Sequence, residues 1–213
     1  MSRTVPGNDA ESGGWSALRD RGFELGSYDD DPQPYLRMVA TGREMLDLVA
    51  GANPPVHVLA EITGHFEAVQ TALRDHQVRE QHRPFGHVDA PGRGQFMSPR
   101  VNITCLDRAS ASATVTFGTY FLGGNGAAHG GTIPLMFAEL LGPFAGTDRT
   151  PCRTVYLHVD YRAITPIGVE LAVTAWFERE EGRKRFLRAE LRHGDVVCAA
   201  CEALFIELRP GQP

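Results

Sequence analysis

The sequence predicts an α+β fold in which one antiparallel sheet wraps around a single buried helix. The segment "IPLMFAELLGPF", residues 133–144, has helical spacing and is apolar nearly all round, so the helix should be buried on every side. A strand-like segment, "ASATVTFGTYFL", precedes it. Because a sheet must bury its apolar face against another layer, the helix should lie on the concave face of the sheet. The remaining strands are expected near residues 152–162, 168–179, 183–193 and 196–208.

Alternation of apolar and polar residues supports these strands. The segment "VELAVTAWF" is the clearest, because every second residue is apolar and a strand turns every second side chain to the same face. Glycines at 182 and 194 lie where consecutive strands would be joined by hairpin turns. The apolar face of the clearest strand would carry Val169, Leu171, Val173, Ala175 and Phe177.

The first half of the chain has a different character. Residues 35–51 and 56–77 show helical spacing of apolar residues, and Gly51 and the "NPP" that follows separate the two helices. Proline and glycine are frequent in residues 83–100, which predicts a connector, and its "GRGQF" glycines are only weak indicators of phosphate binding. We therefore expect a flexible segment 1–34, a helical extension and connector 35–94, a β-rich domain 95–208 and a tail 209–213.

Composition excludes several classes of partner. The 213 residues carry a net charge of −5 and no Lys/Arg tract, so a nucleic-acid partner is not expected. No run of about 18 apolar residues could span a membrane. The first residues, "MSRTVPGNDAESGGW", contain no apolar core of a secretion signal, so we expect a cytoplasmic protein.

The pair Cys198 and Cys201 invites a redox or zinc interpretation. Its surroundings, "DVVCAACEALFIEL", indicate a buried strand, on which these two side chains would point to opposite faces. We therefore interpret both residues as structural core cysteines and expect no metal.

The stretch "GGNGAAHGGTIPLMFAELLG", residues 123–142, places a glycine pair at the start of the apolar helix. The first N–H groups of a helix have no partner within the helix and lie at the positive end of its dipole. Glycine lets a carbonyl oxygen approach such groups closely, which is the geometry of an oxyanion hole. The alternative is a glycine-rich strand-to-helix turn whose His129 is satisfied locally.

The motif "AAHGGTIPLMFAELLG" resembles the central motif of PaaI-like acyl-CoA thioesterases of the hotdog fold. The resemblance extends over about residues 95–208 and includes "RTVYLHVDYRAITPIG" and "EGRKRFLRAELRHGDVVCAACEALF". It implies an antiparallel sheet wrapped around a central helix, and an acyl-CoA substrate whose coenzyme A is part of the substrate. No separate cofactor is implied.

The resemblance also implies roles for particular residues. The Gly130 N–H would polarise the thioester carbonyl, and His129 and Gly131 would shape that pocket. Thr154 occupies a position where the family often orients the attacking water, although it is equally an ordinary strand threonine. Arg183 and Lys184 match a basic pair near the coenzyme A phosphates, although a solvated turn explains them as well.

Two positions depart from the family pattern. The family acid normally lies nine residues after the histidine, where this chain has Ala138, and Glu139 follows one residue later. That step turns a side chain about 100° round an ideal helix. An amide six residues before the histidine is replaced by Gly123, and Asn125 lies two residues on. Glu139 is therefore expected either as the displaced catalytic carboxylate or as a structural carboxylate near a subunit interface.

The expected activity is hydrolysis of an acyl-CoA thioester, with Glu139 as general base or nucleophile. Gly130 and Glu139 lie about 12–13 Å apart along one helix, so one chain cannot place both on the same thioester. We therefore expect a homodimer or a dimer of dimers in which Glu139 acts across the interface. The alternatives are a non-catalytic acyl-CoA-binding hotdog protein, because Ala138 lacks a carboxylate, and, less favoured, a hotdog hydratase or dehydratase.

Overall fold

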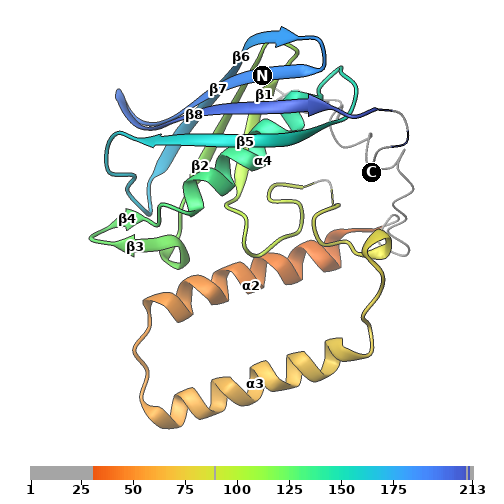
Figure 1. Ribbon diagram of the computed structural model, residues 1–213. Coiled ribbons are helices and arrows are strands. Elements are labelled where there is room, and N and C mark those ends of the chain that lie inside the picture. The colour runs from red at the N-terminus through yellow and green to blue at the C-terminus, as the bar shows by residue number, and fades with distance from the viewer. Residues whose placement is uncertain (1–30, 89, 210, 212–213) are drawn as a thin grey trace, which may run out of the picture.

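The structure, a computed structural model, describes residues 31–88, 90–209 and 211; the predicted flexible segment therefore lies almost entirely outside the described residues. Two helices lead into a β-rich half that contains the third helix (Figure 1). The helices are α2 (Gln33–Gly51), α3 (Val56–Arg74) and α4 (Thr132–Gly146), and the short 3-10 helices are η2 (Glu80–His82) and η3 (Thr119–Phe121). The strands are β1 (Val101–Leu106), β2 (Ser110–Thr116), β3 (Leu122–Gly124), β4 (Ala127–Ala128), β5 (Cys152–Tyr161), β6 (Glu170–Glu181), β7 (Lys184–His193) and β8 (Val196–Glu207).

Six strands form one antiparallel sheet in the order β1-β2-β6-β7-β8-β5. The sheet curves around α4, as the sequence predicts, and leaves β1 and β5 as its edges (Figure 1). The two glycine turns have the left-handed backbone that tight hairpins need, with φ of +56° at Gly182 and +57° at Gly194. The α+β class and the wrapped helix are therefore confirmed.

Strand β1 and the small β3–β4 hairpin are absent from the sequence prediction. The predicted strand over "ASATVTFGTYFL" ends at Thr116, and the chain then forms η3 and the hairpin. Strand β1 is an edge strand whose residues are mostly exposed or half-buried, so its sequence lacks the alternation that marks the inner strands.

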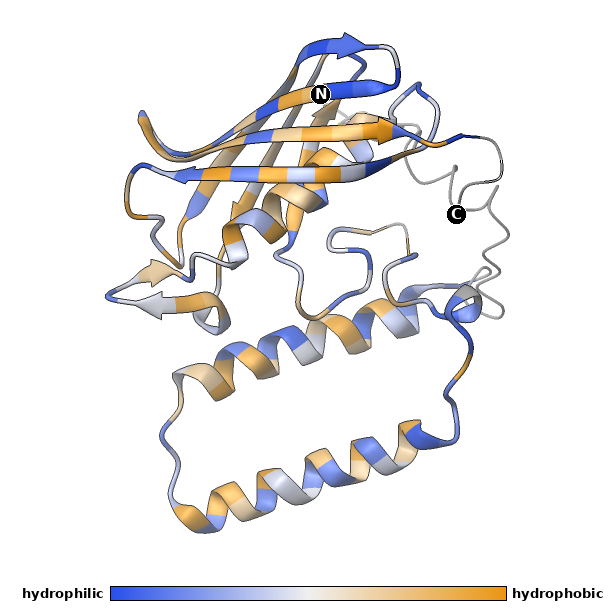
Figure 2. Ribbon diagram, in the orientation of Figure 1, coloured by the Kyte–Doolittle hydropathy of each residue, from blue (hydrophilic) through white to orange (hydrophobic). Residues whose placement is uncertain are grey.

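The core lies between α4 and the concave face of the sheet. Figure 2 shows apolar residues concentrated on α4 and on the strands around it. The predicted inner face of β6 is confirmed for Leu171, Val173 and Ala175, each at most 2% exposed. The residues of α4 that are fully buried against the sheet are Met136, Phe137, Leu140, Leu141, Phe144 and Ala145.

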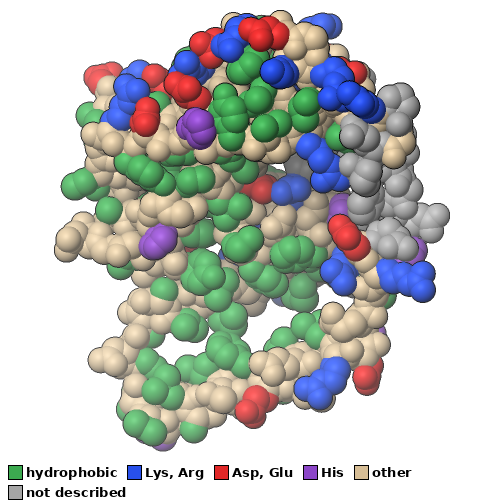
Figure 3. Space-filling model, in the orientation of Figure 1, with side chains coloured by type: hydrophobic (Ala, Val, Ile, Leu, Met, Phe, Trp, Pro, Cys, Tyr) green, Lys and Arg blue, Asp and Glu red, His purple; other side chains and the backbone are tan. Residues whose placement is uncertain are grey.

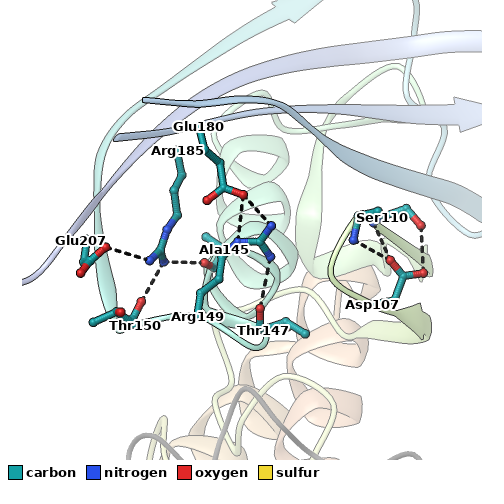
Figure 4. Close-up of polar contacts among 10 residues, drawn as sticks. Asp107, Ser110, Ala145, Thr147, Arg149, Thr150, Glu180, Arg185 and Glu207 are labelled. Carbon is teal, nitrogen blue, oxygen red and sulfur yellow. Dashed lines mark hydrogen bonds and ion pairs between the residues drawn. The ribbon is translucent and has the colours of Figure 1, made fainter. Parts of the chain in front are cut away.

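Arginines hold the C-terminal end of α4 in place (Figure 4). The buried Arg185 on β7 donates hydrogen bonds to the carbonyl oxygens of Ala145, at 2.8 Å, and Thr150, at 2.7 Å. Its Nη2 also lies 3.5 Å from a Glu207 carboxylate oxygen. Arg149 binds Glu180 and donates to a carbonyl near the same helix end. The Arg185 side chain thus satisfies a carbonyl of the last helical turn, which the helix itself cannot pair, and both arginines bind the segment that follows.

Both cysteines of the "CAAC" segment are buried free thiols of the same core cluster. Strict alternation would have placed them on opposite faces of the strand. The pairing of β8 with β7 is irregular at this point, since Arg192 faces Val197 but Leu191 faces Ala199, so Cys198 falls in a bulge. The interpretation as core cysteines agrees with this burial.

The helix α2 is attached to the β-rich half. Asp47 accepts a 2.7 Å hydrogen bond from the Tyr120 N–H, and Arg43 donates to the Gln95 carbonyl oxygen. In contrast, none of the α3 residues is buried. Within the described residues, no helix has both the length and the apolar character that a membrane crossing needs.

Candidate active site

A short loop connects the β3–β4 hairpin to the first turn of α4. The His129 N–H donates to the Phe121 carbonyl oxygen at 2.7 Å, and the Thr132 N–H donates to the His129 carbonyl oxygen at 2.9 Å. The Gly131 N–H donates to His129 Nδ1 at 3.0 Å. Because Nδ1 accepts this bond, the neutral ring carries its proton on Nε2, on a side chain that is exposed.

The Gly130 N–H is free for a ligand. No acceptor within residues 31–88 and 90–209 lies within hydrogen-bond range of it, and Gly130 is exposed. The Gly130 carbonyl oxygen accepts a 2.6 Å hydrogen bond from the Tyr161 hydroxyl at the end of β5, which fixes this peptide from the other side. A free N–H at the start of a buried helix can donate to a thioester carbonyl.

The hairpin explains why an amide is missing at position 123. A Cβ on Gly123 would lie 2.8 Å from the His129 Cα, closer than a side chain can approach, so this loop requires glycine there. Asn125 has φ of +50° and Gly126 has φ of +75°, so they form the Asn-Gly turn of the hairpin. The structure thus gives Asn125 a role in the turn.

Glu139 forms a two-point ion pair with Arg93. The Arg93 Nη2 lies 2.6 Å from Oε1 of Glu139, and its Nε donates to Oε2 at 2.9 Å. The Glu139 side chain is 7% exposed and the Arg93 side chain is 29% exposed. A guanidinium that binds both oxygens of a carboxylate fixes the orientation of that carboxylate.

Arg93 lies in a part of the connector that has an unusual backbone conformation. Gly92, Arg93 and Gly94 have φ of +75°, +50° and +69°, so three successive residues are left-handed. A Cβ on Gly92 would collide with the Arg43 guanidinium, and one on Gly94 would lie 2.7 Å from the Tyr35 ring. The "GRGQF" glycines therefore allow close packing of the connector on α2.

Ala138 lies on the more open side of α4. It is half-buried, as are Leu135 and Gly142 at helical spacing from it, whereas Glu139 points into the protein. A carboxylate at position 138 would have faced this open side, and alanine supplies none.

The other predicted residues lie away from Gly130 within one protomer. Thr154 is exposed near the start of edge strand β5, seven residues and roughly 23 Å along the strand from Tyr161. Arg183 and Lys184 lie at the β6–β7 turn, near the C-terminal end of α4, and Arg183 donates to the Glu207 carbonyl oxygen at 3.2 Å. Since α4 has 15 residues, its two ends are about 21 Å apart.

Sequence reasoning missed Arg93 and the contact of Tyr161 with Gly130. Neither has a local signature, because 46 and 31 residues of chain separate the paired groups. The only signal for Arg93 was its position between two glycines of the connector.

No family model matches the chain. A search of curated proteins finds the acyl-coenzyme A thioesterase THEM4 of Xenopus laevis, 34% identical over 95 residues. The alignment covers 44% of this chain and 43% of that protein, so the chain matches less than half of its relative's length.

Among solved structures, the thioesterase superfamily protein RHA08564 superposes with a TM-score of 0.70 at 23% identity, over 80% of this chain and 89% of that one. The Escherichia coli PaaI protein of the phenylacetic acid degradation operon matches at a TM-score of 0.49 and 15% identity, over 51% of this chain and 80% of that one.

The architecture and the RHA08564 match define a hotdog fold, as the resemblance implied. The superposition covers 80% of the chain, which is more than residues 95–208 alone. The chain is a hotdog protein similar to acyl-CoA thioesterases, and the predicted resemblance is confirmed.

Proposed function

We propose that the protein hydrolyses acyl-CoA thioesters to a free acid and coenzyme A. One observation carries the proposal: the free N–H of Gly130 at the start of the buried helix α4. This donor would bind the thioester oxygen and stabilise the negative charge that develops on it when water attacks the carbonyl carbon. The sulfur would then leave as a thiolate and take up a proton. The similarity to THEM4 supports the same substrate class.

In this proposal Glu139 is the general base, supplied by the second protomer. A carboxylate has about four lone-pair sites, and the two N–H groups of Arg93 use two of them, so the ion pair leaves capacity to accept a proton from water. However, the carboxylate is nearly buried in the protomer. Hydrolysis by this route therefore requires that water reach it through the open side of α4.

A dimer formed along β5 would bring the separated groups closer. This ten-residue edge strand exposes Val155 at 53% and Tyr161 at 55%, and an unpaired edge is a template for pairing with another chain. If the two α4 helices of such a dimer pack antiparallel, each helix end meets the middle of its mate, where Glu139 lies.

The ion pair also favours a second candidate, a hotdog protein that binds acyl-CoA without hydrolysing it. In that case Arg93 and Glu139 fasten the connector to α4, and Ala138 leaves the open side without a base.

A panel of acyl-CoAs assayed for thiol release, with mass spectrometry of the bound ligand, separates the two candidates. A hydrolase releases thiol with at least one acyl-CoA, and the Glu139→Gln variant, of the same size, loses turnover but keeps ligand binding. A binding protein returns every thioester intact. The Arg93→Lys variant is the control, because it keeps one positive charge beside Glu139 while removing the two-point geometry.

A further inference from the structure

A cavity of about 340 Å³ between α2 and the connector is lined by three arginines. Arg37 and Arg43 come from α2, and Arg100 directly precedes β1. No Asp or Glu of the described chain lines this cavity. Its remaining walls are mostly apolar, formed by Leu36, Val39, Ala40, Ala90 and Pro91.

In the part of the chain that the structure describes, these three arginines form no ion pair with a carboxylate. Within residues 31–88 and 90–209, no carboxylate oxygen lies within 4.0 Å of any of the three guanidinium groups. Burial and the nearby positive charge of Arg100 lower the pKa of Arg43, and Glu139 offsets this only in part. Clustered cations facing a cavity repel one another and attract an anion.

The cavity continues into a second one beside α2 and η3. A second cavity of about 270 Å³ adjoins it, sharing Ala40, Arg43 and Arg100, and reaches Tyr120 and Phe121. The carbonyl oxygen of Phe121 accepts the His129 N–H, next to Gly130. The second cavity, which Asp47 also lines, therefore extends from Arg43 and Arg100 to the residue that is hydrogen-bonded to the neighbour of Gly130. In the same protomer, Arg183 and Lys184 lie by the opposite end of α4.

We propose that Arg37, Arg43 and Arg100 bind the phosphate groups of the nucleotide part of coenzyme A, with the adenosine against the apolar wall of the cavity. This inference rests on the proposed acyl-CoA substrate. Guanidinium groups bind phosphate oxygens through paired, charge-assisted hydrogen bonds, and an apolar wall suits a purine. The pantetheine arm then follows the second cavity to Gly130.

Binding of adenosine 3′,5′-bisphosphate, measured by titration calorimetry, tests the site without any thioester. Arg37 and Arg100 are exposed, so the Arg37→Gln/Arg100→Gln variant should fold. Its affinity is expected to fall about 10- to 100-fold, because two charge-assisted contacts are lost. Arg108→Gln, which removes an exposed arginine from the β1–β2 turn, is the matched control and should bind as the wild type does.

Unchanged affinity in the double variant overturns the proposal, as does a loss of binding in Arg183→Gln/Lys184→Gln alone. Inorganic pyrophosphate that competes as well as the bisphosphate also counts against it, because the cavity would then recognise any anion. Melting curves of the double variant and of Arg37→Gln alone verify that each variant is folded at the temperature of the titration.

A second measurement separates this site from the hydrolysis proposal. For acyl-CoA, the double variant should raise KM and leave kcat unchanged, whereas an acyl-pantetheine, which lacks the nucleotide, should be hydrolysed equally by both proteins. If no thioester is hydrolysed, the hydrolase proposal fails, while the calorimetric comparison still decides the nucleotide site.

Discussion

At the residue scale, the Gly130 N–H and the Glu139 carboxylate differ in what they are free to do. The N–H is exposed and has no acceptor within the described residues, so it can serve a ligand directly. The carboxylate is oriented by Arg93 and nearly buried. Polarisation of a carbonyl therefore needs no rearrangement of the protomer, whereas proton transfer to Glu139 needs access through the open side of α4.

The Gly130→Pro variant tests the donor, because proline has no N–H. Loss of one such donor lowers kcat about 10²- to 10³-fold in enzymes that stabilise an oxyanion. Gly130→Ala is the control: its Cβ would lie no closer than 3.6 Å to the Tyr161 hydroxyl, so it keeps both the N–H and the loop. The assay is thiol release by folded protein. Near-normal turnover by Gly130→Pro would remove the assignment.

The cysteines should differ in reactivity. Burial, helped by Glu202, raises the pKa of Cys201 to about 12, so almost none of this thiol is ionised near pH 8. Cys198 is fully buried, whereas Cys105 is exposed. Iodoacetamide at pH 8, read by peptide mass spectrometry, should label Cys105 and spare the other two until the protein is denatured. Labelling of Cys201 in the native state at the rate of Cys105 would contradict its place in the core.

At the element scale, α4 is held at each end by a different kind of contact. Its N-terminal end follows the loop of His129 and Gly130, and its C-terminal carbonyl oxygens face arginine side chains (Figure 4). An apolar helix inside a curved sheet has few polar neighbours, so the side chains at its ends determine how it is oriented in the sheet.

Arg185→Met should destabilise the protein by roughly 2–3 kcal/mol, because it leaves the carbonyl oxygens of Ala145 and Thr150 without their charged donor. Lys184→Met is the control, since Lys184, the chain neighbour of Arg185, is exposed. Urea unfolding monitored by fluorescence measures both variants. Equal midpoints for the two would mean that the buried arginine adds nothing to the position of α4.

Strands with one buried face could be predicted from sequence, and elements without one could not. The alternation in β6 follows from its burial, so Leu171, Val173 and Ala175 were predicted correctly. The Gly130 turn could be located because a glycine pair before an apolar helix has a local signature. The partner of Glu139 could not be found, because the fold brings Arg93 to it from a connector with no periodicity.

At the scale of the whole molecule, the two leading helices are attached unequally. Helix α2 contacts the β-rich half through Asp47 and Arg43, whereas α3 lies on the far side of α2 (Figure 1). A space of about 620 Å³ separates the two helices and is lined mainly by apolar side chains, which appear green around the lower opening in Figure 3. Side chains that border this space, such as Leu48 and Leu59, stay 66% and 48% exposed.

The rate of amide hydrogen exchange should therefore differ among the three helices. Amides of α3 are expected to exchange faster than those of α4 by more than an order of magnitude, because α3 buries no residue and opens without disturbing the core. Helix α2 should fall between them. Exchange measured by mass spectrometry on peptides from each helix gives the order. Protection of α3 equal to that of α4 would show that α3 packs against a partner in solution.

The last prediction is that the active unit is a dimer whose site is completed across the interface. Gly130 lies two residues before the first residue of α4, and Glu139 lies seven residues into the helix, so more than about 10 Å separates them along the helix axis, which is too far for one chain to place both on a single thioester. Gly130→Pro lacks the donor and Glu139→Gln lacks the base, so each homodimer should be inactive.

A mixture of the two variants forms hybrids that contain one intact site, and up to about half of the wild-type activity per hybrid should return once subunits exchange. Native mass spectrometry of the mixture, with one variant isotope-labelled, verifies the exchange and the dimer. The control mixture pairs Gly130→Pro with Arg108→Gln, which is expected to be active by itself, and so measures any inhibition that mixing causes. Hybrids that form and stay inactive would exclude Glu139 as a base acting across the interface. The role of the Arg93–Glu139 ion pair would then be to hold the connector against α4.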